Sequence, residues 1–232
     1  MGILRHAAEC VQRNLSLFGL YVLLIAGSRS LVLLADWSVG ALGAERPLND
    51  FLVYTLVANV VLLFITALAQ TIVFAKLGAA VDCPLWKLSG MREALRRYFP
   101  LWLVFNAIAL ALNFMIILLE GAAGVLQLLF MVIAIGYIPV GACIMFYRAF
   151  SWAELGRVLR PLLREGPKAF VIFTFSGICF FGYFTFLIQV QHQPYLQPLV
   201  EIIFAYTDLL VFCASWLICM IDRESPEEDV EF

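Results

Sequence analysis

The residues of this sequence that could do chemistry are charged residues that lie within long apolar stretches. Arg29 lies near the middle of residues 16–43, where an unpartnered charge costs at least about 2.5–3.5 kcal/mol in a bilayer. Asp208 lies in the last apolar stretch, within about 6 Å of the depth of Arg29 if both stretches cross a membrane. We expect these two residues to pair, with Asp36 as the alternative partner. The pair would relay protons or ions, or act as a structural clasp, and we favour the clasp.

Polar side chains recur along the other apolar stretches, often about two helical turns apart. Such side chains avoid lipid and face neighbouring helices or a hydrated cavity. Both outcomes remain open, although hydrogen bonding between helices is the favoured one. The sequence therefore predicts a polar bundle interior made of Asn59, Gln70, Asn106, Asn113, Glu120 and Glu201.

Motifs of catalysis or metal binding are absent from the sequence. It contains no Walker motif, no HExxH and no GxSxG. The only histidines, His6 and His192, lie near opposite ends of apolar stretches, and the six cysteines form no CxxC pair. We therefore expect no enzyme activity, no catalytic residue, no metal and no cofactor.

The composition is that of a membrane protein. Hydrophobic residues make up 63% of the 232 residues and charged residues 14%, with a mean hydropathy of +0.95, against about 45–50% and about 25% in soluble domains. We expect an all-α, polytopic membrane domain over residues 1–232, with a polar arm (1–15), a bundle (16–221) and an acidic tail (222–232). Six apolar stretches predict six transmembrane helices in three hairpins: 16–43, 51–77, 101–119, 124–147, 169–190 and 198–221. Pro139 predicts a kink in the fourth.

The basic residues are distributed unevenly between the connections. All of the fifteen Lys and Arg residues except Arg29 and Arg46 fall on one side of the predicted spans. By the positive-inside rule, both termini and both long loops are cytoplasmic. The expected location is a plasma membrane, the inner membrane of a bacterium.

The two long loops have the pattern of basic amphipathic helices, over residues 85–98 and 151–165. Apolar residues and Trp recur there at helical spacing opposite basic side chains. Such helices lie in the headgroup layer and bind anionic lipids. The basic residues concerned are Lys87, Arg92, Arg96 and Arg97 in the first loop, and Arg157, Arg160 and Arg164 in the second.

The stretch around Pro139, Phe146-Tyr-Arg148, residues 157–164 and Gly166-Pro167-Lys168-Ala169-Phe170 resembles bacterial six-helix membrane-domain families. These include the membrane domains attached to glycerophosphodiester phosphodiesterases and their uncharacterised relatives. The resemblance implies three hairpins with basic amphipathic loops. It carries no active site across, because the phosphodiesterase domain is absent from this chain.

Two functions follow from these features. The first is a non-enzymatic integral subunit that packs within or scaffolds a larger membrane complex, with other membrane subunits or further copies of itself as partners. Its motivation is the near absence of loops on the outer side. The second is a permease, or transporter membrane subunit, that works with a separate ATPase docked on the basic loops. Nothing in the sequence favours a nucleic-acid partner.

Overall fold

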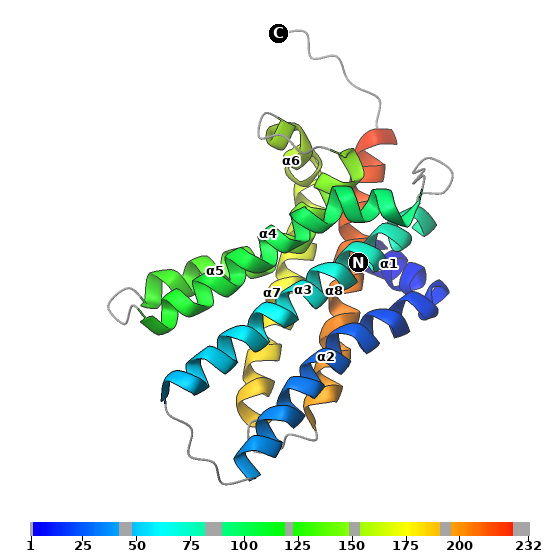
Figure 1. Cartoon of the computed structure of the whole chain (residues 1–232). Coiled ribbons are helices and arrows are strands. Elements are labelled where there is room, and N and C mark those ends of the chain that lie inside the picture. Colours follow the sequence, from blue (N-terminus) through cyan, green and yellow to red (C-terminus); the bar gives the residue numbers. More distant parts are fainter. Residues whose placement is uncertain are drawn as a thin grey trace.

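The computed structural model describes residues 2–41, 48–81, 90–118, 123–148, 154–190 and 196–224. These residues fold into eight helices, and no strand occurs among them. In chain order the helices are α1 (Gly2–Arg13), α2 (Leu15–Ala41), α3 (Leu48–Val81), α4 (Met91–Leu118), α5 (Ala123–Tyr147), α6 (Leu155–Arg164), α7 (Gly166–Val190) and α8 (Gln197–Glu224) (Figure 1).

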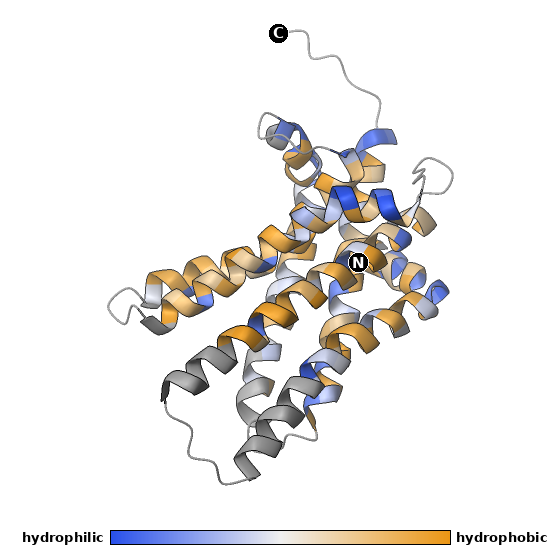
Figure 2. Ribbon diagram, in the orientation of Figure 1, coloured by the Kyte–Doolittle hydropathy of each residue, from blue (hydrophilic) through white to orange (hydrophobic). Residues whose placement is uncertain are grey.

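The long helices have the length and composition of membrane spans. Five of them, α3, α4, α5, α7 and α8, are long and apolar enough to cross a membrane, and the bent pair of α1 with the described part of α2 provides a sixth. Apolar residues cover most of their length in Figure 2. The prediction of an all-helical chain is therefore confirmed for the described residues, and the long apolar helices are compatible with a multi-pass membrane protein.

Helix α8 is the centre of the packing. It contacts α1, α2, α3, α5, α6 and α7, while the sequence neighbours α2 and α3, α4 and α5, and α7 and α8 also pack together. Most of the side chains of α8 from Ala205 to Cys219 are buried. The first and last long helices are therefore in contact, as expected from the proposed clasp.

A layer of aromatic rings joins the helices in the core. The Phe74 ring stacks on Phe212 with 4.3 Å between centroids and meets Trp102 edge-on at 5.0 Å. Trp102 fits only because residue 141 is a glycine, where a Cβ would lie 2.5 Å from the indole. Gly78 makes the same room for Trp216. Small residues that allow such close approach are typical of membrane helix interfaces.

The N-terminal segment, expected only to be a polar arm, forms a helix. Helix α1 buries Ala7 and Val11 and packs against α8. It meets α2 at an angle of 85°. At the bend, the Asn14 side-chain amide donates a hydrogen bond of 2.9 Å to the Cys10 carbonyl, and the Asn14 carbonyl accepts from Leu17 and Phe18. Asn14 thus stabilises both the end of α1 and the beginning of α2.

The two predicted amphipathic helices have different outcomes. Residues 91–98 are not a separate interfacial helix, because α4 begins at Met91 and continues through Pro100 to Leu118. Pro100 has no backbone N–H, so the carbonyl of Arg96, four residues earlier, lacks its helical hydrogen bond. Arg96 is exposed at the polar end of the helix, where water can donate to this carbonyl. Helix α6 matches the second prediction, with Val158 and Leu162 buried. Lys87 lies outside the described residues.

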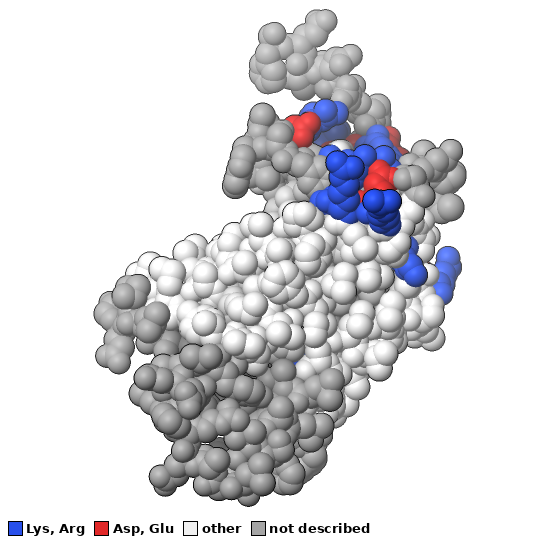
Figure 3. Space-filling model, in the orientation of Figure 1, with Lys and Arg blue, Asp and Glu red and all other residues white. Residues whose placement is uncertain are grey.

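Most of the exposed charged residues in the described part of the chain gather at one end of the molecule. Figure 3 shows the Lys and Arg side chains around the start of α4, α6 and α1, above a broad uncharged surface. The described arginines of the two predicted basic loops are all exposed at this end: Arg92, Arg96 and Arg97 on α4, and Arg157, Arg160 and Arg164 on α6.

Pro139 lies inside helix α5, which continues through it from Ala123 to Tyr147. The kink expected at this proline stays a prediction.

Candidate functional site

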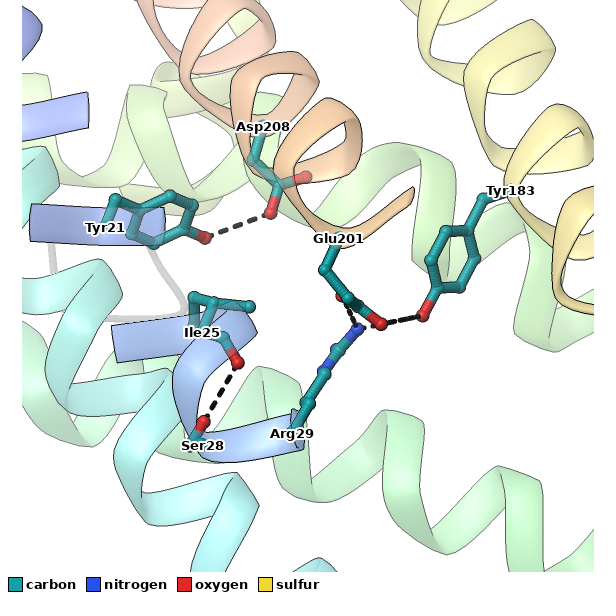
Figure 4. A network of polar contacts seen from close by, with 7 residues as sticks. All are labelled: Tyr21, Ile25, Ser28, Arg29, Tyr183, Glu201 and Asp208. Carbon is teal, nitrogen blue, oxygen red and sulfur yellow. Dashed lines mark hydrogen bonds and ion pairs between the residues drawn. The ribbon is translucent and has the colours of Figure 1, made fainter. Parts of the chain in front are cut away.

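Arg29 of α2 meets Glu201 of α8 in the interior of the bundle. Its Nη1 donates to Glu201 Oε2 at 2.5 Å and to the Tyr183 hydroxyl at 2.9 Å. The Tyr183 hydroxyl in turn donates to Glu201 Oε1 at 2.9 Å. Figure 4 shows the three side chains converging from α2, α7 and α8. Both carboxylate oxygens of Glu201 therefore have donors, as a buried charge requires.

The predicted pairing of Arg29 with Asp208 is not the arrangement found. The Asp208 carboxylate accepts a hydrogen bond of 3.0 Å from the Tyr21 hydroxyl, and the ion pair of Arg29 is with Glu201. Glu201 precedes Asp208 by seven residues, or about 10 Å along a helix. The long side chain of Arg29 reaches toward this earlier turn of α8, and Tyr21 satisfies Asp208 instead. Asp36 lies on α2, and its side chain is outside the described part of the structure.

A second polar cluster joins α3, α4 and α5. The Asn106 amide donates to Gln70 Oε1 and to the Trp102 carbonyl, both at 2.7 Å. The Gln70 amide donates to the Tyr137 hydroxyl at 3.3 Å. Gln70 is fully buried, so water does not reach its side-chain amide, and these bonds provide its hydrogen-bond partners. Two of the predicted interior residues, Gln70 and Asn106, are thus hydrogen-bonded between helices.

Three further predicted interior residues, Asn59, Asn113 and Glu201, line an open hollow of about 480 Å³, called the cavity below. Every one of the six long helices contributes to its lining: α2 provides Arg29, and α8 provides Glu201. Apolar side chains complete the wall. The polar lining residues are Arg29, Asn59, Thr66, Asn106, Asn113, Tyr183, Gln197 and Glu201. Glu120, also predicted to face the interior, lies outside the described residues.

Three tyrosines at this site were not among the predicted residues: Tyr21, Tyr137 and Tyr183. Each places a phenol hydroxyl on a carboxylate or an amide of another helix. In the sequence they look like the other aromatic residues of the apolar stretches. The signal that distinguishes them is their depth, because a tyrosine well inside a span needs a partner for its hydroxyl.

The chemistry available in the cavity is binding by hydrogen bonds and one charge. The side chain of Arg29 is 29% exposed and that of Glu201 1% exposed, so the cationic partner of the pair is the accessible one. Amide side chains supply further donors and acceptors. Among the described residues, no group of three or more His, Cys, Asp or Glu side chains is placed to hold a metal ion.

The described members of the predicted basic set, which excludes Lys87, do not line this cavity. Arg97 pairs with Glu93 at 2.9 Å on the first turns of α4, and Arg164 lies 3.7 Å from Asp222. Both pairs belong to the charged end of the molecule.

Comparison with protein families, curated proteins and solved structures finds no match to this chain.

Proposed function

We propose that this chain is a permease, or the membrane subunit of one, that binds a small polar solute in the cavity between its six long helices. The observation that supports this proposal is the composition of the cavity wall, to which all six helices contribute and in which Arg29 and amides stand beside apolar side chains. Its volume of about 480 Å³ lies in the range of small-molecule sites.

A static scaffold subunit, the other function expected from the sequence, needs no such space. Helices that only pack together bring their polar side chains into contact, as Gln70 and Asn106 do. Asn113 and Gln197 instead line an open volume, and Arg29 lines it beside its ion pair with Glu201. Polar groups kept at membrane depth around a cavity are characteristic of solute pathways.

The orientation and the partners are part of the same proposal. The basic end of the molecule (Figure 3) would face the cytoplasm, in contact with anionic lipid headgroups of a bacterial plasma membrane. The exposed arginines of α6 would then be available to a separate ATPase. Both chain termini would lie on this cytoplasmic side.

The proposal requires water in the cavity, and cysteine labelling tests this. Asn113→Cys places a thiol in the cavity wall, whereas Ile108→Cys, on the same helix, places it at an exposed apolar position outside the cavity lining. Cys10, Cys83 and Cys179 are first replaced by Ser, and the fully buried Cys143, Cys213 and Cys219 are retained. A charged, membrane-impermeant methanethiosulfonate is added to either side of sealed vesicles.

We expect the thiol at position 113 to react and the thiol at position 108 to remain unmodified, because lipid covers it and excludes an ionic reagent. The side from which labelling occurs also reports which end of the cavity is open. Absence of labelling at position 113 from both sides would show a dry interior and favour the scaffold function.

A further inference from the structure

A second hollow lies beside the polar cavity, between α7 and α8. Its volume is about 310 Å³, and its lining is apolar apart from Cys179, Tyr183 and Thr207. The apolar lining includes Gly182, Phe186, Leu199, Ile203 and Phe204. Phe186 and Ile203 are strongly exposed. We call this hollow the α7–α8 groove.

Tyr183 lines both the groove and the cavity. Its ring stacks on Phe204, a groove residue, with 4.4 Å between centroids. Its hydroxyl joins Arg29 and Glu201 at the cavity wall, as Figure 4 shows. One side chain therefore separates an apolar compartment from a polar one.

The polar compartment favours an anionic group. Among the described residues, Arg29 donates both of its hydrogen bonds from a single nitrogen, Nη1, and a guanidinium carries five N–H donors in all. The carboxylate of Glu201 is shielded by its own partners and is 1% exposed. A phosphate or carboxylate in the cavity thus meets the positive partner of the ion pair and the amides of Asn113 and Gln197.

We propose that the solute is an anionic amphiphile whose oxyanion head binds at Arg29 in the cavity and whose hydrocarbon chain lies in the α7–α8 groove. This inference rests on the proposed function and names its substrate class. An ordinary water-soluble anion would use the cavity and leave the groove unoccupied. A neutral lipid would use the groove and leave Arg29 without a ligand.

Three probes separate these possibilities: dioleoyl phosphatidic acid, dioleoylglycerol and glycerol 3-phosphate. Binding of each to the purified full chain in neutral detergent is measured by native mass spectrometry. We expect the phosphatidic acid to bind at least tenfold more tightly than either the neutral lipid or the free head group.

Gly182→Leu tests the groove itself. Gly182 lines the groove, and a Cβ at this position meets nothing within 4 Å, so a larger side chain can begin there without a clash at its first atom. Gly19→Leu is the matched control, because a Cβ there also meets nothing within 4 Å and Gly19 does not line the groove. We expect Gly182→Leu to weaken phosphatidic acid binding at least tenfold and Gly19→Leu to leave it unchanged.

The same comparison separates the groove from the basic end of the molecule, where an anionic lipid would bind equally in the wild type and in both variants. Phosphatidic acid binding that is absent in the wild type, or unchanged in Gly182→Leu, overturns the inference. Equal binding of glycerol 3-phosphate overturns it as well, while leaving the proposed function in place. The proposed function is decided separately by labelling at position 113.

Discussion

At the scale of single residues, the buried carboxylate of Asp208 is stabilised by a hydrogen bond from the phenol of Tyr21. Tyr21 is fully buried, and its hydroxyl is the donor to the buried Asp208 carboxylate. Tyr21→Phe removes this donor and leaves the carboxylate in an apolar environment. We expect a loss of about 1–3 kcal/mol in the free energy of unfolding, measured by reversible unfolding in mixed micelles.

The control for this substitution is Tyr206→Phe on α8. The Tyr206 ring packs edge-on against Phe18 at 5.7 Å, and within the described residues its hydroxyl has no hydrogen bond. We expect a change of less than about 0.5 kcal/mol. Equal effects of the two substitutions would mean that the bond from Tyr21 to Asp208 contributes nothing.

The residue types of the site were predictable, and their pairing was not. A guanidinium within a span requires an acid on another helix, and the sequence places Glu201 and Asp208 on the same stretch, about two turns apart. Depth counted from the ends of apolar stretches has an error of about one turn. The choice also depends on the length of the Arg29 side chain, and on two tyrosines: Tyr21 donates to Asp208, and Tyr183 donates to Glu201.

At the scale of elements, the contact between α4 and α5 depends on Gly141. The Trp102 indole occupies the space where a side chain of residue 141 would begin. Gly141→Ala forces Trp102 to shift, and overpacking of this kind costs about 1–3 kcal/mol. Thermal unfolding in detergent should therefore begin at a lower temperature than in the wild type.

Gly136→Ala provides the comparison on the same helix. A Cβ there would lie 3.9 Å from Phe173, an ordinary contact, so the better helix propensity of alanine, up to about 1 kcal/mol, is expected to dominate. The account of the Trp102 contact fails if Gly141→Ala unfolds at the same temperature as Gly136→Ala.

The elements themselves follow largely from the sequence. Each of the six apolar stretches corresponds to one long helix, and residues 151–165 contain α6. The omission of α1 has a physical reason: its burial depends on α8, more than 180 residues later in the chain. The continuity of α4 through Pro100 was missed because a proline near a polar helix end is tolerated more readily than one in the interior.

At the scale of the whole molecule, the cavity is the feature that the sequence indicates only indirectly. Polar side chains at two-turn spacing predict interior faces, but the same pattern serves hydrogen bonding and cavity lining. Asn106 does both, since it bonds to Gln70 and lines the cavity. Only the arrangement of six helices shows which polar faces meet and which remain apart.

The closure of this arrangement depends on the ion pair that ties α2 to α8 at the cavity wall. Two double-mutant cycles test it: Arg29→Met with Glu201→Gln, and Arg29→Met with Asp208→Asn. The measured quantity is the coupling in the free energy of unfolding, in mixed micelles. We predict about 1–3 kcal/mol for Arg29 with Glu201, because breaking a buried pair leaves the other charge uncompensated. The cycle with Asp208 should give less than about 0.5 kcal/mol, and a larger coupling to Asp208 than to Glu201 would contradict the account.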